Sequence, residues 1–383
     1  MTGTILHVAD VHLEAPFSSG GLPPVVGTRR RQDLREALKR ALALARKERV
    51  DAVTIAGDLY DGRCALPETG AFLAGAFAAV APIPVVIAPG CADAMDGGSS
   101  PLLSVYALTR WPDNVTILPP GPLSSVEVAP GLSIWGAAWS AGGPPELPPE
   151  APDDGRRLLL LHVGSVAARE AGAPLPNGLT ADALRAAGFS YALLGGRHGG
   201  GAWPQEEPCG CFAGSLEPLA PDEMAGRHGA VLVRIGADGA CTAKWQEDAR
   251  WRYVALSVDL GGCENEDAAA RRIEAALKHD RVRTDARAVA AITVTGLPEE
   301  GLDLTEVEAR VDARAYLTMR VERPFPYDLD QLAQERTVRG LLVRRFRAAP
   351  DADAPLDHDL RMKALSLALQ ALDGKGVRPS EVA

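Results

Sequence analysis

Long apolar runs are missing from this sequence of 383 residues. Glycine, proline or a charged residue interrupts every candidate segment before it reaches the roughly 20 residues that a membrane-spanning helix needs. The N-terminus also lacks a basic segment followed by an apolar stretch, so we expect no signal peptide. The sequence therefore predicts a cytoplasmic protein that does not enter a membrane.

Cysteine is scarce, and its spacing is not that of a disulfide framework or a zinc ribbon. The six cysteines are Cys64, Cys91, Cys209, Cys211, Cys241 and Cys263. We expect them to be reduced, as in most cytoplasmic proteins. Cys209 and Cys211 have the spacing of half a soft-metal site, but two small residues in a strand are the interpretation we favour.

The sequence also has no excess of positive charge. The chain has 40 Lys and Arg residues against 50 Asp and Glu residues, a net charge of −10. This balance argues against a protein that holds DNA through a broad positive field. Basic clusters at residues 29–31 and 339–347 remain, on segments with helical spacing. We therefore expect tight DNA binding to need a partner protein.

The composition is that of a globular protein, with 46% hydrophobic and 23% charged residues. The length suits two domains, the first of ordinary enzyme size. Near the N-terminus, apolar runs at 4–9, 52–56 and 84–88 alternate with helical spacing at 30–47 and 69–80. This alternation predicts a layered α/β domain with ligands at the carboxyl ends of its strands.

The pattern changes near residue 250 to that of a small α+β unit followed by helices. We expect strands at 254–260, 289–294 and 317–321, and helices at 266–278, 307–315, 329–346 and 360–372. The predicted division is residues 1–250 for the first domain, 251–325 for a small α+β domain and 326–383 for a C-terminal helical region.

Polar residues recur where the apolar strands end. They are Asp10 and His12, Asp58, residues 90–93, His162 and His198. Carboxylates and imidazoles gathered at one edge of a sheet are typical metal ligands. Phosphate-ester hydrolysis uses such a set, because two cations a few Å apart activate a water and neutralise the phosphoryl oxygens. Asp58 is our candidate for the carboxylate between them.

Other polar residues have plainer interpretations. We expect Asp61 to cap a turn, and His228, His279 and His358 to be structural. His7 would face away from His12 if the first strand stays regular through Asp10, so we give it no role in the site.

The order of these motifs resembles the calcineurin-like metallophosphoesterase pattern DxH, GD, GNH(D/E), H and GHxH. Four segments are similar to the SbcD-type and YhaO-like DNA repair exonucleases: LHVADVHLEAPF, VDAVTIAGDLYDG, FAGSLEPL and QERTVRGLLVRRF. The resemblance implies an α/β fold, a metallophosphoesterase sandwich of two sheets flanked by helices. A small α+β capping domain and C-terminal helices are implied to follow it.

The resemblance also implies the ligands. The first metal would take Asp10, His12, Asp58 and His198, all of which are present. The second would take Asp58, His162, the asparagine of GNH and the first histidine of GHxH. The last two positions hold Cys91 and Gly196 in this chain. The catalytic histidine of the family, which contacts the phosphate and assists the leaving group, falls at Ala92.

These departures predict one divalent ion rather than two, Mn²⁺ by resemblance, with Zn²⁺, Fe²⁺ or Mg²⁺ open. Loss of a positioned general acid typically slows a reaction by about 10²- to 10⁴-fold. A rewired second site of Asp58, Cys91 and His162 stays open, because a thiolate is a good zinc ligand. Asp93 or Asp96 could add a further ligand to it.

Two main functions and a weaker third remain. The first is a weak or altered divalent-metal-dependent phosphodiesterase, the nuclease subunit of a DNA repair complex. The second is a catalytically inactive scaffold that dimerises and docks a partner, and a small-molecule phosphodiesterase is a weaker third. The resemblance implies a homodimer, an SbcC-type coiled-coil ATPase docked on the helices after Leu329, and DNA contacts made mainly through the complex.

Overall fold

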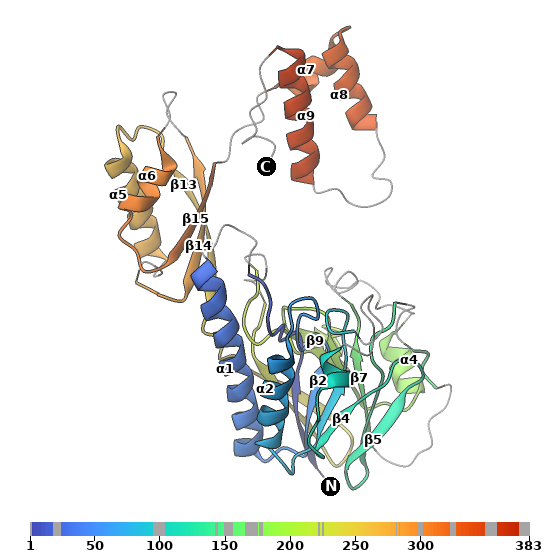
Figure 1. Ribbon diagram of the computed structural model, residues 1–383. Coiled ribbons are helices and arrows are strands. Elements are labelled where there is room, and N and C mark those ends of the chain that lie inside the picture. Colours follow the sequence, from blue (N-terminus) through green and yellow to red (C-terminus); the bar gives the residue numbers. More distant parts are fainter. Residues whose placement is uncertain are drawn as a thin grey trace.

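The computed structural model of the chain (Figure 1) places three β-sheets and their helices. The structure describes residues 2–374 apart from 18–23, 95–103, 142–144, 149–155, 165–174, 176–178, 221–222, 224–225, 281, 283, 297–301, 322–326 and 349–357. Among these residues, no helix is both long and apolar enough to cross a membrane.

The first sheet has six strands in the order β12-β11-β1-β2-β3-β4. Their bounds are β1 (Gly3–Val8), β2 (Ala52–Ala56), β3 (Val85–Ala88), β4 (Val115–Ile117), β11 (Ala230–Ile235) and β12 (Cys241–Gln246). The strands from β1 to β4 are parallel, while β11 and β12 run antiparallel to their neighbours. The carboxyl ends of β1, β2 and β3 therefore meet at one edge.

The second sheet also has six strands, in the order β5-β6-β7-β8-β10-β9. Their bounds are β5 (Ser124–Ala129), β6 (Leu132–Gly136), β7 (Arg156–His162), β8 (Tyr191–Gly195), β9 (Gly201–Trp203) and β10 (Gly210–Phe212). The four central strands β6, β7, β8 and β10 are parallel. Only β7 and β8 end at a predicted motif, at His162 and just before Gly196.

The two sheets bury a shared core, and helices cover their outer faces (Figure 1). Buried residues of both sheets, including Ile5, Val86, Leu158 and Leu193, form one apolar cluster. The helices α1 (Pro24–Glu48), α2 (Pro67–Ala78) and α3 (Val105–Leu108) pack on the first sheet, and α4 (Ala181–Ala186) packs on the second. The predicted sandwich of two sheets flanked by helices is confirmed.

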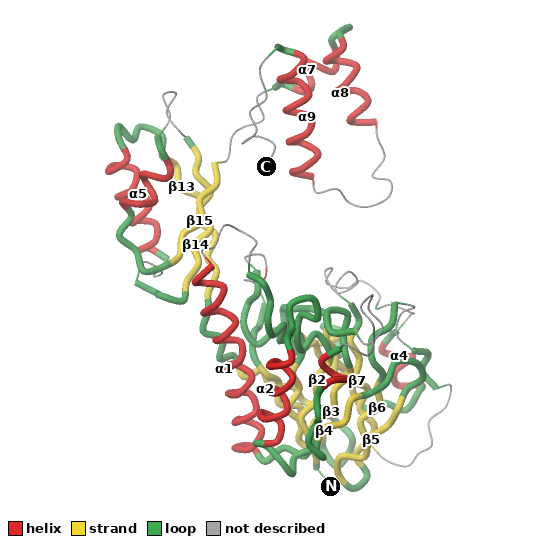
Figure 2. Tube along the Cα trace, in the orientation of Figure 1, coloured by secondary structure: helices red, strands yellow, loops and turns green. Residues whose placement is uncertain are grey.

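A third, all-parallel sheet contains β13 (Arg252–Asp259), β14 (Ala288–Thr295) and β15 (Tyr316–Val321). The helices α5 (Glu266–His279) and α6 (Leu304–Arg310) cover one of its faces (Figure 2). The helix predicted over 307–315 instead spans Leu304–Arg310. It starts earlier because the side chain of Asp303 accepts hydrogen bonds from the Thr305 and Glu306 amides.

The third sheet meets the first domain around Arg30 of α1, whose side chain is buried. Its guanidinium carbon lies 4.2 Å from the ring centre of Phe17, 4.9 Å from that of Trp251 and 5.0 Å from that of Tyr253. It also donates hydrogen bonds to the Tyr253 hydroxyl and the Pro218 carbonyl. A desolvated cation between aromatic rings stabilises this junction.

The C-terminal region consists of α7 (Leu329–Gln334), α8 (Val338–Ala348) and α9 (His358–Leu372). The single helix predicted over 329–346 is wrong, because the Thr337 hydroxyl accepts a hydrogen bond from the Gly340 amide and starts a new helix. The apolar faces of these helices pack on one another through Leu332, Val343, Leu365 and Leu369. Leu341 and Leu372 stay exposed, each at 46%.

His7 lies buried between the two large sheets. Its Nδ1 atom is 3.1 Å from the Thr54 hydroxyl and its Nε2 atom is 3.2 Å from the Leu194 carbonyl oxygen. Burial lowers the pKa of His7 to about 4, and these two hydrogen bonds oppose that shift only in part. His7 is therefore a neutral link between the sheets.

We predict that His7 makes the fold acid-sensitive. The unfolded chain binds a proton at this ring below about pH 6.5, whereas the folded chain does so only near pH 4. Stability should therefore fall by about 3 kcal/mol from this group between pH 7 and pH 4. Urea unfolding at pH 7, 5.5 and 4.5 would measure it, with His7→Gln showing a shallower decline. His279→Gln, at an exposed position, is the control, and parallel curves for His7→Gln and the unmodified chain would contradict the prediction.

Candidate metal centre

The loops after β1 and β2 contain the first candidate ligands, and these residues have an unusual backbone conformation. Asp10, His12 and Asp58 have φ angles of 50°, 48° and 51°, in the left-handed region that non-glycine residues seldom occupy. Backbone hydrogen bonds hold the loops together, from Asp10 N to Gly57 O at 3.0 Å and from His12 N to Asp58 O at 2.9 Å. Such strained residues cluster at functional sites, and here they turn three side chains toward one point.

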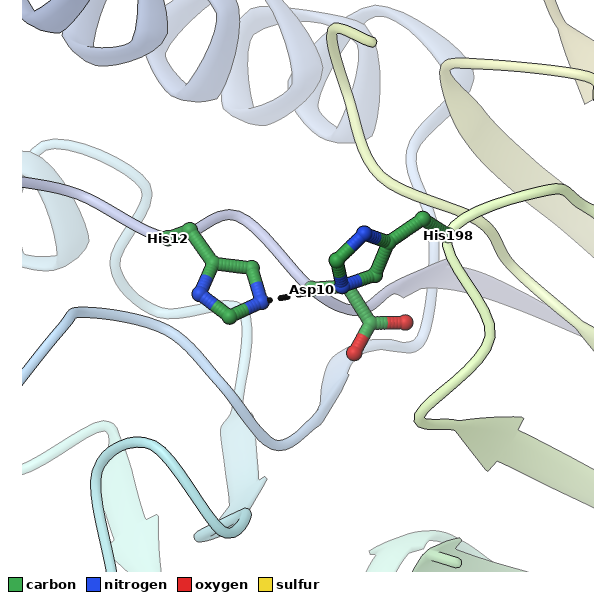
Figure 3. A group of neighbouring side chains, drawn as sticks. All are labelled: Asp10, His12 and His198. Atoms are coloured by element: carbon green, nitrogen blue, oxygen red, sulfur yellow. Dashed lines mark hydrogen bonds between the residues drawn. The ribbon is translucent and has the colours of Figure 1, made fainter. Parts of the chain in front are cut away.

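Asp10, His12 and His198 form the first group of candidate ligands (Figure 3). One ligand atom from each lies within 4.8 Å of the others. The Nε2 atoms of His12 and His198 are 3.1 Å apart. An imidazole from the loop after β8 thus reaches the ligands that follow β1.

Asp58 lies between this group and a second one. Its Oδ2 atom is 3.5 Å from His12 Nε2 and 3.5 Å from His162 Nε2. Its Oδ1 atom accepts a hydrogen bond of 2.7 Å from the Ala92 amide, which fixes the carboxylate. Gly90 permits this approach, because a Cβ atom there would lie 2.3 Å from Asp58 Oδ1.

The second group contains Asp58, Cys91 and His162. The Cys91 sulfur is 3.5 Å from Asp58 Oδ2 and 3.5 Å from His162 Nε2. His162 Nδ1 donates to the Ala56 carbonyl at 3.0 Å, so its Nε2 lone pair faces the other two ligands. The structure thus brings the predicted ligands Asp10, His12, Asp58, Cys91, His162 and His198 into two groups, and Asp58 of the second group lies 3.5 Å from His12 of the first.

Gly196 and Ala92 occupy the positions where the resemblance implies histidines. Gly196 has a φ of 101°, and a Cβ atom there would lie 2.9 Å from the backbone nitrogen of Gly164. A histidine therefore does not fit this backbone. The Gly196 amide lies 3.0 Å from both carboxylate oxygens of Asp10 and orients that side chain. Ala92 is half-buried beside Asp58 and offers no proton.

The electrostatics of the centre favour a cation. Burial raises the pKa of Asp10 to about 6, although the nearby His162 and His198 oppose this. Burial also acts to lower the pKa of His162, but the adjacent Asp58 carboxylate outweighs it and the pKa of His162 is raised. Buried charges this close together are costly unless they are paired, and a bound divalent ion would pair the carboxylates.

Glu223 is a functional residue that sequence reasoning missed. Its Oε1 atom accepts a hydrogen bond of 2.6 Å from His198 Nδ1, and its Oε2 atom accepts one of 2.7 Å from the Leu219 amide. Burial would lower the pKa of His198, but the bond to Glu223 and the charge of Asp10 raise it. A carboxylate on Nδ1 directs the Nε2 lone pair of a histidine toward a metal.

Asp93 does not reach the centre, contrary to one alternative of the sequence analysis. Its buried carboxylate accepts hydrogen bonds from the Gly90 and Leu59 amides at 2.6 and 2.8 Å and from the Tyr106 hydroxyl at 2.7 Å. It therefore braces the loops after β2 and β3. Asp96 lies outside the described residues. Asp61 accepts from the Arg63 amide in a turn, as expected.

Comparisons with known proteins agree with this geometry. The family model Metallophos, calcineurin-like phosphoesterase, matches residues 3–177. This part of the chain is therefore similar to the calcineurin-like phosphoesterases. Members of this family depend on divalent metals, and the two groups of possible ligands fit such ions. The match includes Asp10, Asp58 and His162, while His198 lies beyond it.

Two individual proteins are also similar to this chain. The uncharacterized metallophosphoesterase YhaO of Bacillus subtilis is 26% identical over 268 residues, which cover 67% of this chain and 63% of that protein. The chain thus spans less than two thirds of that relative. The crystal structure of TT1561 of Thermus thermophilus aligns with 64% of this chain and 99% of its own, with 13% identity and a TM-score of 0.33.

We predict that Glu223 sets the metal affinity of the first group. Glu223→Ala should weaken binding of Mn²⁺ by about 10- to 100-fold, because His198 loses the partner that orients it. Isothermal titration of metal-free protein would measure the affinity. Glu247→Ala is the control, since this glutamate pairs with Arg227 at the surface. An unchanged affinity in Glu223→Ala would show that His198 needs no such support.

Proposed function

We propose that this chain is a divalent-metal-dependent phosphodiesterase that acts slowly on DNA. One observation above all supports it: Asp58 Oδ2 lies 3.5 Å from the Nε2 atoms of both His12 and His162. A carboxylate shared by two groups of ligands at the ends of parallel strands suits the hydrolysis of phosphate esters.

Asp10, His12, Asp58 and His198 would hold the cation, with Mn²⁺ expected and Zn²⁺, Fe²⁺ or Mg²⁺ as alternatives. Such an ion, when bound, lowers the pKa of a bound water and neutralises charge on phosphoryl oxygens. The role of the protein backbone is to orient the ligand side chains. The Gly196 amide fixes Asp10 and the Ala92 amide fixes Asp58, so the ligands need little rearrangement.

Departure of the leaving oxygen is the slow step in this proposal. A DNA strand leaves as an alkoxide that needs a proton, and the methyl group of Ala92 cannot donate one. The absence of a positioned acid slows such a reaction by about 10²- to 10⁴-fold. A substrate whose leaving group is already stable as an anion needs no such proton.

DNA is proposed as the substrate because the chain resembles the SbcD-type and YhaO-like nucleases in four segments, and two of these, FAGSLEPL and QERTVRGLLVRRF, contain no proposed metal ligand. The net charge of −10 gives the isolated chain little long-range attraction for DNA. We therefore propose a homodimer that works with a coiled-coil ATPase of the SbcC type, which would contribute most of the DNA contacts.

A catalytically inactive scaffold is the second candidate. Gly196 and Ala92 favour it, because one removes a ligand and the other removes the acid. In this case the centre would keep the fold and the dimer together while a partner supplies the activity.

Two substrates with different leaving groups can distinguish a slow phosphodiesterase from an inactive scaffold. With Mn²⁺, the unmodified chain should hydrolyse bis(4-nitrophenyl) phosphate but cleave linear duplex DNA barely at all. Ala92→His should raise DNA cleavage by about 10²-fold or more and change hydrolysis of the nitrophenyl diester little, because nitrophenolate leaves without a proton.

Two variants complete this test. Ala92→Gln adds bulk without an acid and should leave DNA cleavage low. Asp58→Asn should abolish both reactions. If neither substrate is hydrolysed by the unmodified chain or by Ala92→His, the scaffold is correct. Vigorous DNA cleavage by the unmodified chain would show that the acid comes from elsewhere.

We predict that the C-terminal helices dock the partner. The apolar cluster of α7, α8 and α9 is distinct from the core of the third sheet, so deletion of all residues after Asp328 should leave the rest folded. The truncated chain should fail to co-purify with the ATPase encoded beside it. Leu341→Asp, at an exposed apolar position of α8, should weaken the complex in the full chain. A truncated chain that unfolds, or still binds, would contradict this assignment.

A further inference from the structure

The second group of ligands has the geometry of a zinc site. Cys91 Sγ, His162 Nε2 and Asp58 Oδ2 form a triangle with three sides of 3.5 Å. Tetrahedral zinc with ordinary bonds to sulfur, nitrogen and oxygen sets its ligand atoms about 3.4 to 3.6 Å apart. Octahedral coordination of a smaller hard cation such as Mg²⁺ would bring them to about 3.0 Å. The triangle is thus prearranged for a tetrahedral ion.

Hydrogen bonds on the side away from the centre also fix two of the three donors. His162 Nδ1 is bonded to the Ala56 carbonyl, and Asp58 Oδ1 to the Ala92 amide, so His162 Nε2 and Asp58 Oδ2 face the centre. Both side chains are buried, whereas Cys91 and Ala92 are half-buried. Three protein ligands with one side open to solvent is the arrangement of zinc sites that keep a position for water or substrate.

The chemistry of the donors separates the two groups. Asp10, His12 and His198 offer one carboxylate oxygen and two imidazole nitrogens but no sulfur, a set that several divalent ions, including Mn²⁺, Fe²⁺ and Zn²⁺, can use. Cys91 adds a soft sulfur, which favours Zn²⁺ over Mn²⁺. We propose that Asp58, Cys91 and His162 form a zinc-selective site, joined through Asp58 to a first site that has no sulfur ligand.

This inference goes beyond the proposed hydrolysis, because a zinc ion can complete the centre even if no phosphodiester is cleaved. The full chain, freed of metal with a chelator, is given equal amounts of Zn²⁺ and Mn²⁺ and then desalted. Elemental analysis should find at least one zinc per chain. X-ray absorption at the zinc edge should show one sulfur at about 2.3 Å. Substitution with Co²⁺ should give a thiolate-to-metal charge-transfer band.

Substitutions of Cys91 test whether its sulfur is the zinc ligand. Cys91→Ser should weaken zinc binding by about 100-fold or more and abolish the sulfur signal, since loss of a direct ligand costs at least as much as loss of an outer partner. Cys91→Asn, a hard donor, should shift the preference from zinc toward manganese. Cys64→Ser, at an exposed cysteine, is the matched control and should change nothing. Circular dichroism checks that each variant folds.

Zinc bound without a sulfur neighbour, or zinc binding equal in Cys91→Ser and the unmodified chain, would overturn the inference. The cobalt spectrum of the unmodified chain decides the matter even if a variant fails to fold. Hydrolysis of bis(4-nitrophenyl) phosphate, measured in parallel, keeps the two proposals apart. A sulfur-bound zinc without hydrolysis refutes the proposed enzyme alone, and hydrolysis without sulfur-bound zinc refutes this site alone.

Discussion

The loops after β1 and β2 are joined by the backbone hydrogen bonds from Asp10 to Gly57 and from His12 to Asp58. The rest of the centre depends on this join, because it forces Asp10, His12 and Asp58 into left-handed backbone and points their side chains to a common place. The second sheet then brings His162 and His198 to the same edge from the other side. The parallel strands of both sheets thus make one site from segments almost 190 residues apart in the chain.

Leu219 connects the junction of the third sheet to this centre, because its amide donates a hydrogen bond to Glu223. The Pro218 and Leu219 carbonyls accept hydrogen bonds from Arg30 and from the Tyr253 hydroxyl at the start of the third sheet. A few residues further, Glu223 holds His198. The orientation of one ligand is therefore tied to the packing of the small α+β unit, although that unit contributes no ligand itself.

Sequence reasoning could select the candidate ligands because they follow strands, and strand ends are visible as apolar runs that stop at a polar residue. Asp10, Asp58 and His162 all have this signature. Glu223 and Asp93 have none, since their partners are set by the path of loops. The helix starts at Asp303 and Thr337 were missed for a related reason, because one side-chain hydrogen bond overrides the apolar spacing. His7 was left out correctly, but its place between the sheets was invisible in the sequence.

The backbone at Gly196 has a consequence for how this protein can change over time. With a φ of 101° and the Gly164 nitrogen 2.9 Å from the place of a Cβ atom, position 196 accepts a side chain only if two loops move together. Position 92 has ordinary backbone and needs only a new side chain. Ala92 can therefore be replaced by histidine through one substitution. A side chain at position 196 requires a coordinated remodelling of two loops, so a proton donor is more readily gained by this chain than the missing ligand.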